Sequence, residues 1–178
     1  MSDELIKIAL SYSLGSDLHE AWRAPRKLED GTYEPRMKKS KDEAWNALHG
    51  TDDVDIANCS FDELPSNWQY ENLEAAKVVI GLVYDKTIAG GVLTPEEVEE
   101  LSSIIHYEWL KRNDWVYNPE YGNPTVAVPY DQLPEDEKEK DRAQLKPAID
   151  KVHAYVDGII DINKICEKFN LSEKSKTM

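Results

Sequence analysis

Two pairs of side chains combine an imidazole with an indole at the spacing of one helical turn. His19 lies three residues before Trp22, and His106 lies three residues before Trp109. Residues at i and i+3 share one face of an α-helix. An indole can stack on a planar base, and an imidazole can donate a hydrogen bond to a ligand. The alternative is structural: a tryptophan packed in the core and a histidine bonded to a backbone carbonyl.

A second group of candidate ligand contacts is basic or aromatic. Arginine side chains bind phosphate oxygens through paired hydrogen bonds. The candidates near the first indole are Arg23, Arg26, Arg36 and Tyr33, and those near the second are Arg112 and Tyr117. Between residues 23 and 41 there are seven basic residues, so this stretch predicts an anionic ligand. For both tyrosines, packing with a satisfied hydroxyl is the alternative.

The sequence predicts a binding protein and not an enzyme. Cys59 and Cys166 lie far apart, and the four histidines do not show metal-ligand spacing. No nucleophile–base pair is visible. We therefore expect no metal, no cofactor, and free thiols of the kind found in a reducing cytoplasm. A hydrolase that uses His19 or His106 with a nearby glutamate is left open.

The chain is strongly acidic, with 21 basic and 35 acidic residues and a net charge of −14. Such a surface repels nucleic-acid phosphates and anionic membranes. No apolar run approaches the roughly 18 residues of a membrane helix, and the N-terminus lacks the basic start of a signal peptide. We expect a globular cytoplasmic protein. An acidic decoy for a DNA-binding protein is the alternative, although acids alternating with Lys and Arg over 135–142 are typical of a solvated helix face.

The elements that must position these residues occur twice along the chain. Phe61-Asp62-Glu63-Leu64-Pro65 reappears as Tyr130-Asp131-Gln132-Leu133-Pro134, and continuing without a gap places Asn72 on Asp141. The spacing from His to Leu-Pro is longer in the first half, which indicates an insertion. We therefore expect one compact unit, 1–178, that contains two repeats. The expected segments are repeat 1 at 15–86 with an insertion at about 38–55, repeat 2 at 95–157, and a C-terminal helix and tail at 158–178.

Periodicity and capping residues predict a mainly α fold with minor β content. Thr94 followed by Pro95 is typical of a helix start, and apolar residues recur at helical spacing from Val98 to Leu110. Further helices are expected at 40–48 (capped by Ser40), 71–84, 143–156 and 161–169. Short strands are expected at 115–117 and 125–128, and the tail at 172–178 is expected to be loose.

Three motifs of the second repeat occur together in a fixed order. They are Ile105-His106-Tyr107-Glu108-Trp109, then Trp115-Val116-Tyr117, then a block from Val128-Pro129-Tyr130 to Asp141-Arg142. Together they resemble the RyR domain, the tandem repeat of ryanodine receptors that also occurs in free-standing proteins of bacteria and phages. The first repeat matches more loosely, with Thr32 near the position of the turn Trp and Asn72 in place of the Asp. In the second repeat, the stretch between Trp109 and Trp115 is shorter than in the family.

The resemblance implies two non-catalytic repeats that pack with pseudo-two-fold symmetry and leave a cleft between them. In ryanodine receptors, the helix tryptophans of such a pair are associated with adenine nucleotides, and the matching positions are Trp22 and Trp109. We therefore expect a module that binds, and by binding sequesters, an adenine nucleotide or a nucleotide-derived signal. The alternative is a protein–protein interaction module with an acidic surface. The oligomeric state is left open.

Overall fold

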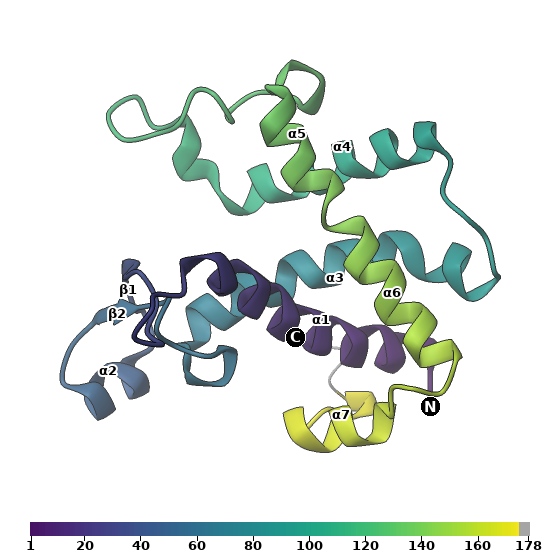
Figure 1. Ribbon diagram of the computed structural model, residues 1–178, viewed down its shortest axis with the longest axis horizontal. Helices are drawn as coiled ribbons and strands as arrows, with labels where there is room; N and C mark the ends of the chain where they lie inside the picture. Colours follow the sequence, from purple (N-terminus) through teal and green to yellow (C-terminus); the bar gives the residue numbers. More distant parts are fainter. Residues whose placement is uncertain (175–178) are drawn as a thin grey trace. The chain divides into compact units, whose positions relative to one another are not determined.

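The computed structural model describes residues 1–174, which are mainly helical with a two-stranded sheet (Figure 1). Residues 175–178, part of the tail expected to be loose, lie outside the described residues. The chain divides into two compact units. We call Ser11–Ala76 the small unit, and Met1–Leu10 together with Lys77–Met178 the large unit. The small unit holds most of the expected repeat 1, and the large unit holds all of the expected repeat 2.

The small unit contains a short antiparallel sheet and one helix of its own. In chain order, the elements that contribute to it are α1 (Asp3–Arg23), η1 (Ala24–Arg26), β1 (Met37–Lys39), α2 (Glu43–His49), β2 (Asp53–Asp55), η2 (Phe61–Glu63) and α3 (Ser66–Ile88). The strands pair with Met37 opposite Asp55 and Lys39 opposite Asp53. Figure 1 shows β1, β2 and α2 together. They occupy the expected insertion, for which the sequence predicted a helix.

The helix of the insertion begins later than its expected cap. Asp42, not Ser40, is the N-cap of α2, and its carboxylate accepts hydrogen bonds from the backbone N–H groups of Trp45 (3.1 Å) and Ser66 (3.0 Å). The Ser40 hydroxyl instead accepts from the backbone N–H of Asp42. One carboxylate therefore satisfies the starts of two helices, α2 and α3, which explains why it replaces the serine as cap.

The large unit is built around the middle of the chain and its C-terminal helices. Beyond the shared helices α1 and α3, its elements are α4 (Pro95–Arg112), η3 (Asp114–Tyr117), η4 (Tyr130–Gln132), α5 (Glu135–Arg142), α6 (Leu145–Val156) and α7 (Ile162–Phe169). The predicted start at Thr94 is confirmed, because Thr94 and Glu97 form a reciprocal capping box. α4 packs against α5 and η4. The buried side chains of its core cluster are Leu110, Val116, Val126, Tyr130 and Leu133.

The two strands expected in the second repeat are wrong. Residues 115–117 lie in η3, and residues 125–128 form turns. The cause is local hydrogen bonding by asparagine. The Asn118 side chain accepts from the backbone N–H groups of Glu120 and Tyr121, and the Asn123 backbone N–H closes the loop by donating to Val116 O at 2.9 Å. These bonds replace the ladder that a strand would need.

Candidate functional site

His19 is a buried link between α1 and the segment that precedes η2. Only 3% of the residue is exposed, and its Nε2 lies 2.8 Å from the carbonyl oxygen of Cys59. Because a carbonyl can only accept, Nε2 must carry the proton and donate it. Burial lowers the pKa of His19, which favours the neutral ring. Its Nε2 is therefore engaged by the protein.

Trp22 and Arg26 form a stacked pair one turn further along. Trp22 is half-buried and lies offset against the His19 ring, with centroids 5.8 Å apart and planes 20° apart. The guanidinium of Arg26 lies 4.3 Å from the centroid of the Trp22 ring. Pro25 ends α1 and η1 then turns the chain, which brings Arg26 back over the indole. An indole beside an arginine offers a planar surface and a positive charge at one place.

Arg23 has a structural role in the same unit. It is buried, its Nε donates to Ala57 O at 2.8 Å, and its Nη1 bonds the Glu20 carboxylate at 3.1 Å. Its guanidinium also lies 4.2 Å from the centroid of the Tyr33 ring. These contacts commit the Nε and Nη1 groups of Arg23 and its flat face to the protein.

Tyr33 and Arg36 lie on the segment that runs alongside the loop after β2. The backbone N–H of Tyr33 donates to the Asn58 side chain, and the backbone N–H of Arg36 donates to the Asp55 carboxylate, both at 2.9 Å. The Arg36 side chain is exposed. Within residues 1–174, neither Arg26 nor Arg36 is ion-paired, so their guanidinium groups remain available to a ligand.

The second candidate set lies in the large unit. His106 is buried, with its Nε2 2.8 Å from Val128 O, and Trp109 is half-buried against the core cluster. The two rings have centroids 6.1 Å apart and planes 16° apart. Arg112 is half-buried at the end of α4, and Tyr117 is 56% exposed. The structure thus brings His106 and Trp109 together, and no arginine of residues 1–174 lies over the Trp109 ring as Arg26 lies over Trp22.

The two histidines make the same contact at the same offset in sequence. Cys59 stands two residues before Phe61, and Val128 stands two residues before Tyr130. In each unit the carbonyl of that residue accepts the histidine Nε2–H. The sequence predicted the shared helix faces, but only the fold identifies the carbonyl partners, which lie 40 and 22 residues away.

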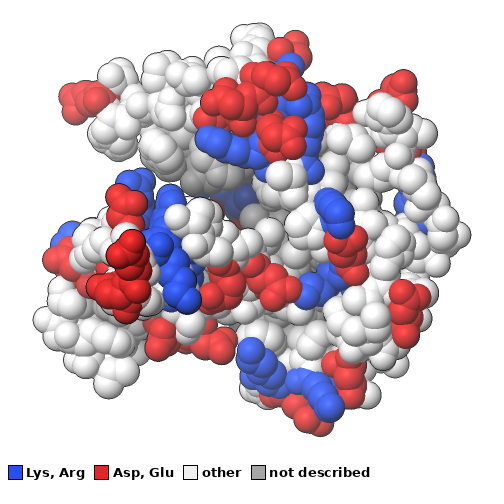
Figure 2. Space-filling model, in the orientation of Figure 1, with Lys and Arg blue, Asp and Glu red and all other residues white. Residues whose placement is uncertain are grey.

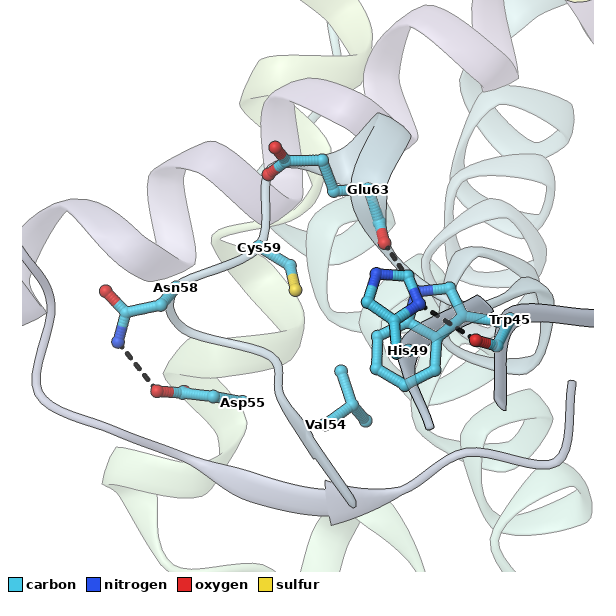
Figure 3. Close-up of a pocket in the computed structure, with 7 residues that line it drawn as sticks. All are labelled: Trp45, His49, Val54, Asp55, Asn58, Cys59 and Glu63. Carbon is cyan, nitrogen blue, oxygen red and sulfur yellow. Dashed lines mark hydrogen bonds between the residues drawn. The ribbon is translucent and has the colours of Figure 1, made fainter. Parts of the chain in front are cut away.

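A hollow of about 290 Å³ in the small unit was not expected from the sequence. It is lined by Trp45, His49, Val54, Asp55, Asn58, Cys59 and Glu63 (Figure 3). The Trp45 and His49 rings stack at 3.8 Å, and the His49 Nδ1–H donates to Trp45 O at 2.8 Å. Figure 3 shows the Cys59 sulfur and the His49 ring beside the same hollow, whereas the Glu63 carboxylate points away. The β1–β2 pairing assembles this hollow, and no local sequence pattern predicts the hollow.

Burial and hydrogen bonding set the protonation of two groups that line the hollow. Burial raises the pKa of the Cys59 thiol, so the sulfur stays protonated at neutral pH and is a poor nucleophile. Burial also acts to raise the pKa of Asp55, but hydrogen bonds from Arg36, Asn58 and Ala57 outweigh it and hold that pKa below its usual range. Among residues 1–174 there is no group of three His, Cys, Asp or Glu side chains that could hold a metal ion.

Comparison with known proteins leaves the family open. No protein-family model and no curated protein matches this chain. The resemblance to the RyR domain therefore depends on the motifs themselves. None of the helices in the described part of the chain is both long enough and apolar enough to cross a membrane.

Proposed function

We propose that the protein is a non-catalytic binding module for an adenine nucleotide or a nucleotide-derived signal, held by Trp22 and Arg26 of the small unit. The observation that carries this proposal is the Arg26 guanidinium 4.3 Å from the centroid of a half-buried indole. A planar base that replaces the guanidinium on the ring, or stacks beside it, leaves Arg26 free to meet a phosphate.

The charge distribution supports an anionic ligand at this place. Residues 23–41 contain seven basic and three acidic residues, in a chain whose net charge is −14. Burial lowers the pKa of Lys38, and the nearby positive charge of Arg36 lowers it further, whereas hydrogen bonds to Asp53 and Asp52 raise the pKa of Lys39. Figure 2 shows Lys and Arg side chains gathered over part of the small unit, beside acidic ones. A bound anion would reduce the repulsion between the positive charges of Arg36 and Lys38.

The matched histidine contacts support the proposal that the chain contains two copies of one module. In both units the helix histidine binds the carbonyl two residues before an aromatic-Asp-x-Leu-Pro block. This contact commits His19 and His106 to holding backbone, which favours binding over catalysis. Because Cys59 and Cys166 are both free thiols, we propose a reducing compartment such as the cytoplasm.

Thermal denaturation against AMP, ADP, ATP, cyclic dinucleotides and ADP-ribose tests this function. A ligand at 100 times its Kd adds about 2.7 kcal/mol to the free energy of unfolding and raises Tm by several degrees. We expect Arg26→Gln to weaken binding at least tenfold, because it removes the guanidinium charge and keeps a polar side chain. Trp22→Phe should weaken it less, since a smaller ring still stacks. Lys164→Gln, an equal loss of charge on α7, should bind as the wild type does.

Two outcomes would contradict the proposal. One is the absence of a Tm shift with every nucleotide in a protein that melts cooperatively. The other is a shift that Arg26→Gln leaves unchanged, because the anion would then lie elsewhere.

A protein-interaction module is the second candidate, and it has an observation of its own. Trp115, Tyr117 and Tyr121 are 45%, 56% and 66% exposed, within or next to the loop that the bond from Asn123 to Val116 closes. Tryptophan and tyrosine are enriched in interface hot spots. The acidic chain favours a partner with a basic surface. Failure of the nucleotide panel would favour this candidate.

A further inference from the structure

The large unit buries a pair of titratable side chains that join α4 to α5. His106 and Asp141 are 4% and 8% exposed, and the His106 Nδ1 lies 3.5 Å from Asp141 Oδ2. Nucleotide binding at Trp22 does not use this pair. A buried pair of this kind needs a definite arrangement of protons, because an unpaired charge in such a place is costly.

The carbonyl of Val128 fixes one of those protons. It lies 2.8 Å from His106 Nε2 and can only accept, so Nε2 carries a hydrogen in every protonation state that keeps this bond. A neutral His106 ring therefore turns its Nδ1 lone pair toward Asp141. If Asp141 were also ionised, two acceptors would face each other away from water. One further proton, on Nδ1 or on the carboxyl group, removes that conflict.

We propose that this further proton holds the segment from Val128 to Leu133 against α4 and α5. When the pH rises and the proton is lost, the segment is released. We call this proton-dependent attachment the latch. The segment is attached to α4 through the His106–Val128 bond, and its Tyr130 and Leu133 side chains belong to the buried core. Loss of the proton weakens the histidine's position, and with it the carbonyl bond that the histidine makes.

The surroundings of Asp141 agree with loss of the proton as the pH rises. Burial raises the pKa of Asp141 to about 6; His106 and Lys140 act against the rise, and Glu137 adds to it. The other charged groups at this packing site are paired among themselves. Arg142 bonds Glu99 and Glu135, and the Tyr130 hydroxyl donates to Glu99 at 2.9 Å. The ion pair that the structure gives Asp141 is therefore the one with His106.

The sign of the pH dependence follows from linkage. A carboxyl group whose pKa is higher in the folded protein than its ordinary value of 3.8 binds protons more tightly in the folded state. Its contribution to stability is complete below that ordinary value and is lost as the pH rises toward about 6. The small unit offers a contrast. His19 makes the same carbonyl bond, but the position aligned with Asp141 is Asn72, whose Nδ2 donates to Trp68 O. An amide carries no titratable proton.

Asp141→Asn is the direct test, with Asp136→Asn as the matched control. Both changes remove one acid from α5, but Asp136 is exposed. We expect the Tm of Asp141→Asn to approach that of the wild type at pH 4 and to exceed it by a margin that grows through pH 6. Asp136→Asn should differ from the wild type by a nearly constant amount. A margin for Asp141→Asn that stays constant or shrinks from pH 4 to pH 8 would overturn the latch.

A measurement on the wild-type protein keeps the test decisive if the variant does not fold. Long-range ¹H–¹⁵N correlation spectra report the tautomer of each histidine ring. We expect the His106 ring to carry a proton on Nε2 at pH 4, where the Val128 carbonyl accepts it. We also expect the carboxyl ¹³C resonance of Asp141 to move between pH 4 and pH 8, because burial raises the pKa of this group to about 6. A ring protonated on Nδ1 alone, or an Asp141 resonance that does not move over this range, would contradict the proposal.

Discussion

Gly122 is the residue whose replacement has the clearest steric consequence. A Cβ at this position would lie 2.3 Å from the carbonyl oxygens of both Asn118 and Val116, which are backbone atoms held in the closed loop. We predict that Gly122→Ala lowers the free energy of unfolding by about 2–3 kcal/mol, because the loop must open to accommodate the methyl group. Urea denaturation measures this loss.

Gly81 provides the matched control at the residue scale. It lies inside α3, and a Cβ there would meet no atom within 4 Å. Gly81→Ala should therefore leave stability unchanged or raise it by up to about 1 kcal/mol, since alanine is the better helix former. If Gly122→Ala lowered the free energy of unfolding no more than Gly81→Ala does, the loop around Gly122 would not be closed as described.

At the scale of the element, the start of α4 depends on a reciprocal cap. The Thr94 hydroxyl accepts from the Glu97 N–H at 3.2 Å, and the Glu97 carboxylate accepts from the Thr94 N–H at 2.8 Å. We predict that Thr94→Ala costs about 1 kcal/mol in thermal or urea denaturation. Thr94→Ser, which keeps the hydroxyl, should recover most of the loss; failure to recover would assign the effect to the lost methyl group and not to the cap.

The elements also explain what could be predicted from the sequence. The start of α4 and the final helix, capped by Asp161, are encoded by neighbouring residues and were predicted. The β1–β2 sheet was not, because each strand has only three residues and is defined by a partner elsewhere in the chain. The candidate site likewise combines features that are encoded locally with features that depend on distant partners. Residue types and spacing made Trp22 and Arg26 candidate ligand contacts, but the partner of Arg23, Ala57, lies 34 residues away and no local pattern reveals it.

At the scale of the whole molecule, stability and ligand affinity should respond to salt in opposite directions. A net charge of −14 destabilises the folded chain through self-repulsion, which salt screens. Raising NaCl from about 20 to about 200 mM shortens the Debye length by roughly threefold and should therefore raise Tm. Nucleotide affinity at the basic stretch 23–41 should fall over the same range, because salt screens the attraction between these basic residues and the anionic ligand.

Arg26→Gln separates these two electrostatic effects. It changes the net charge of the chain only slightly, so its Tm should rise with salt as the wild-type Tm does. Its residual nucleotide affinity should depend less on salt, because one of the attracting charges is gone. Titration calorimetry at the two salt concentrations measures both proteins. If salt left the wild-type affinity unchanged, the ligand would be held by stacking alone, and the basic stretch would have some other purpose than attracting an anion.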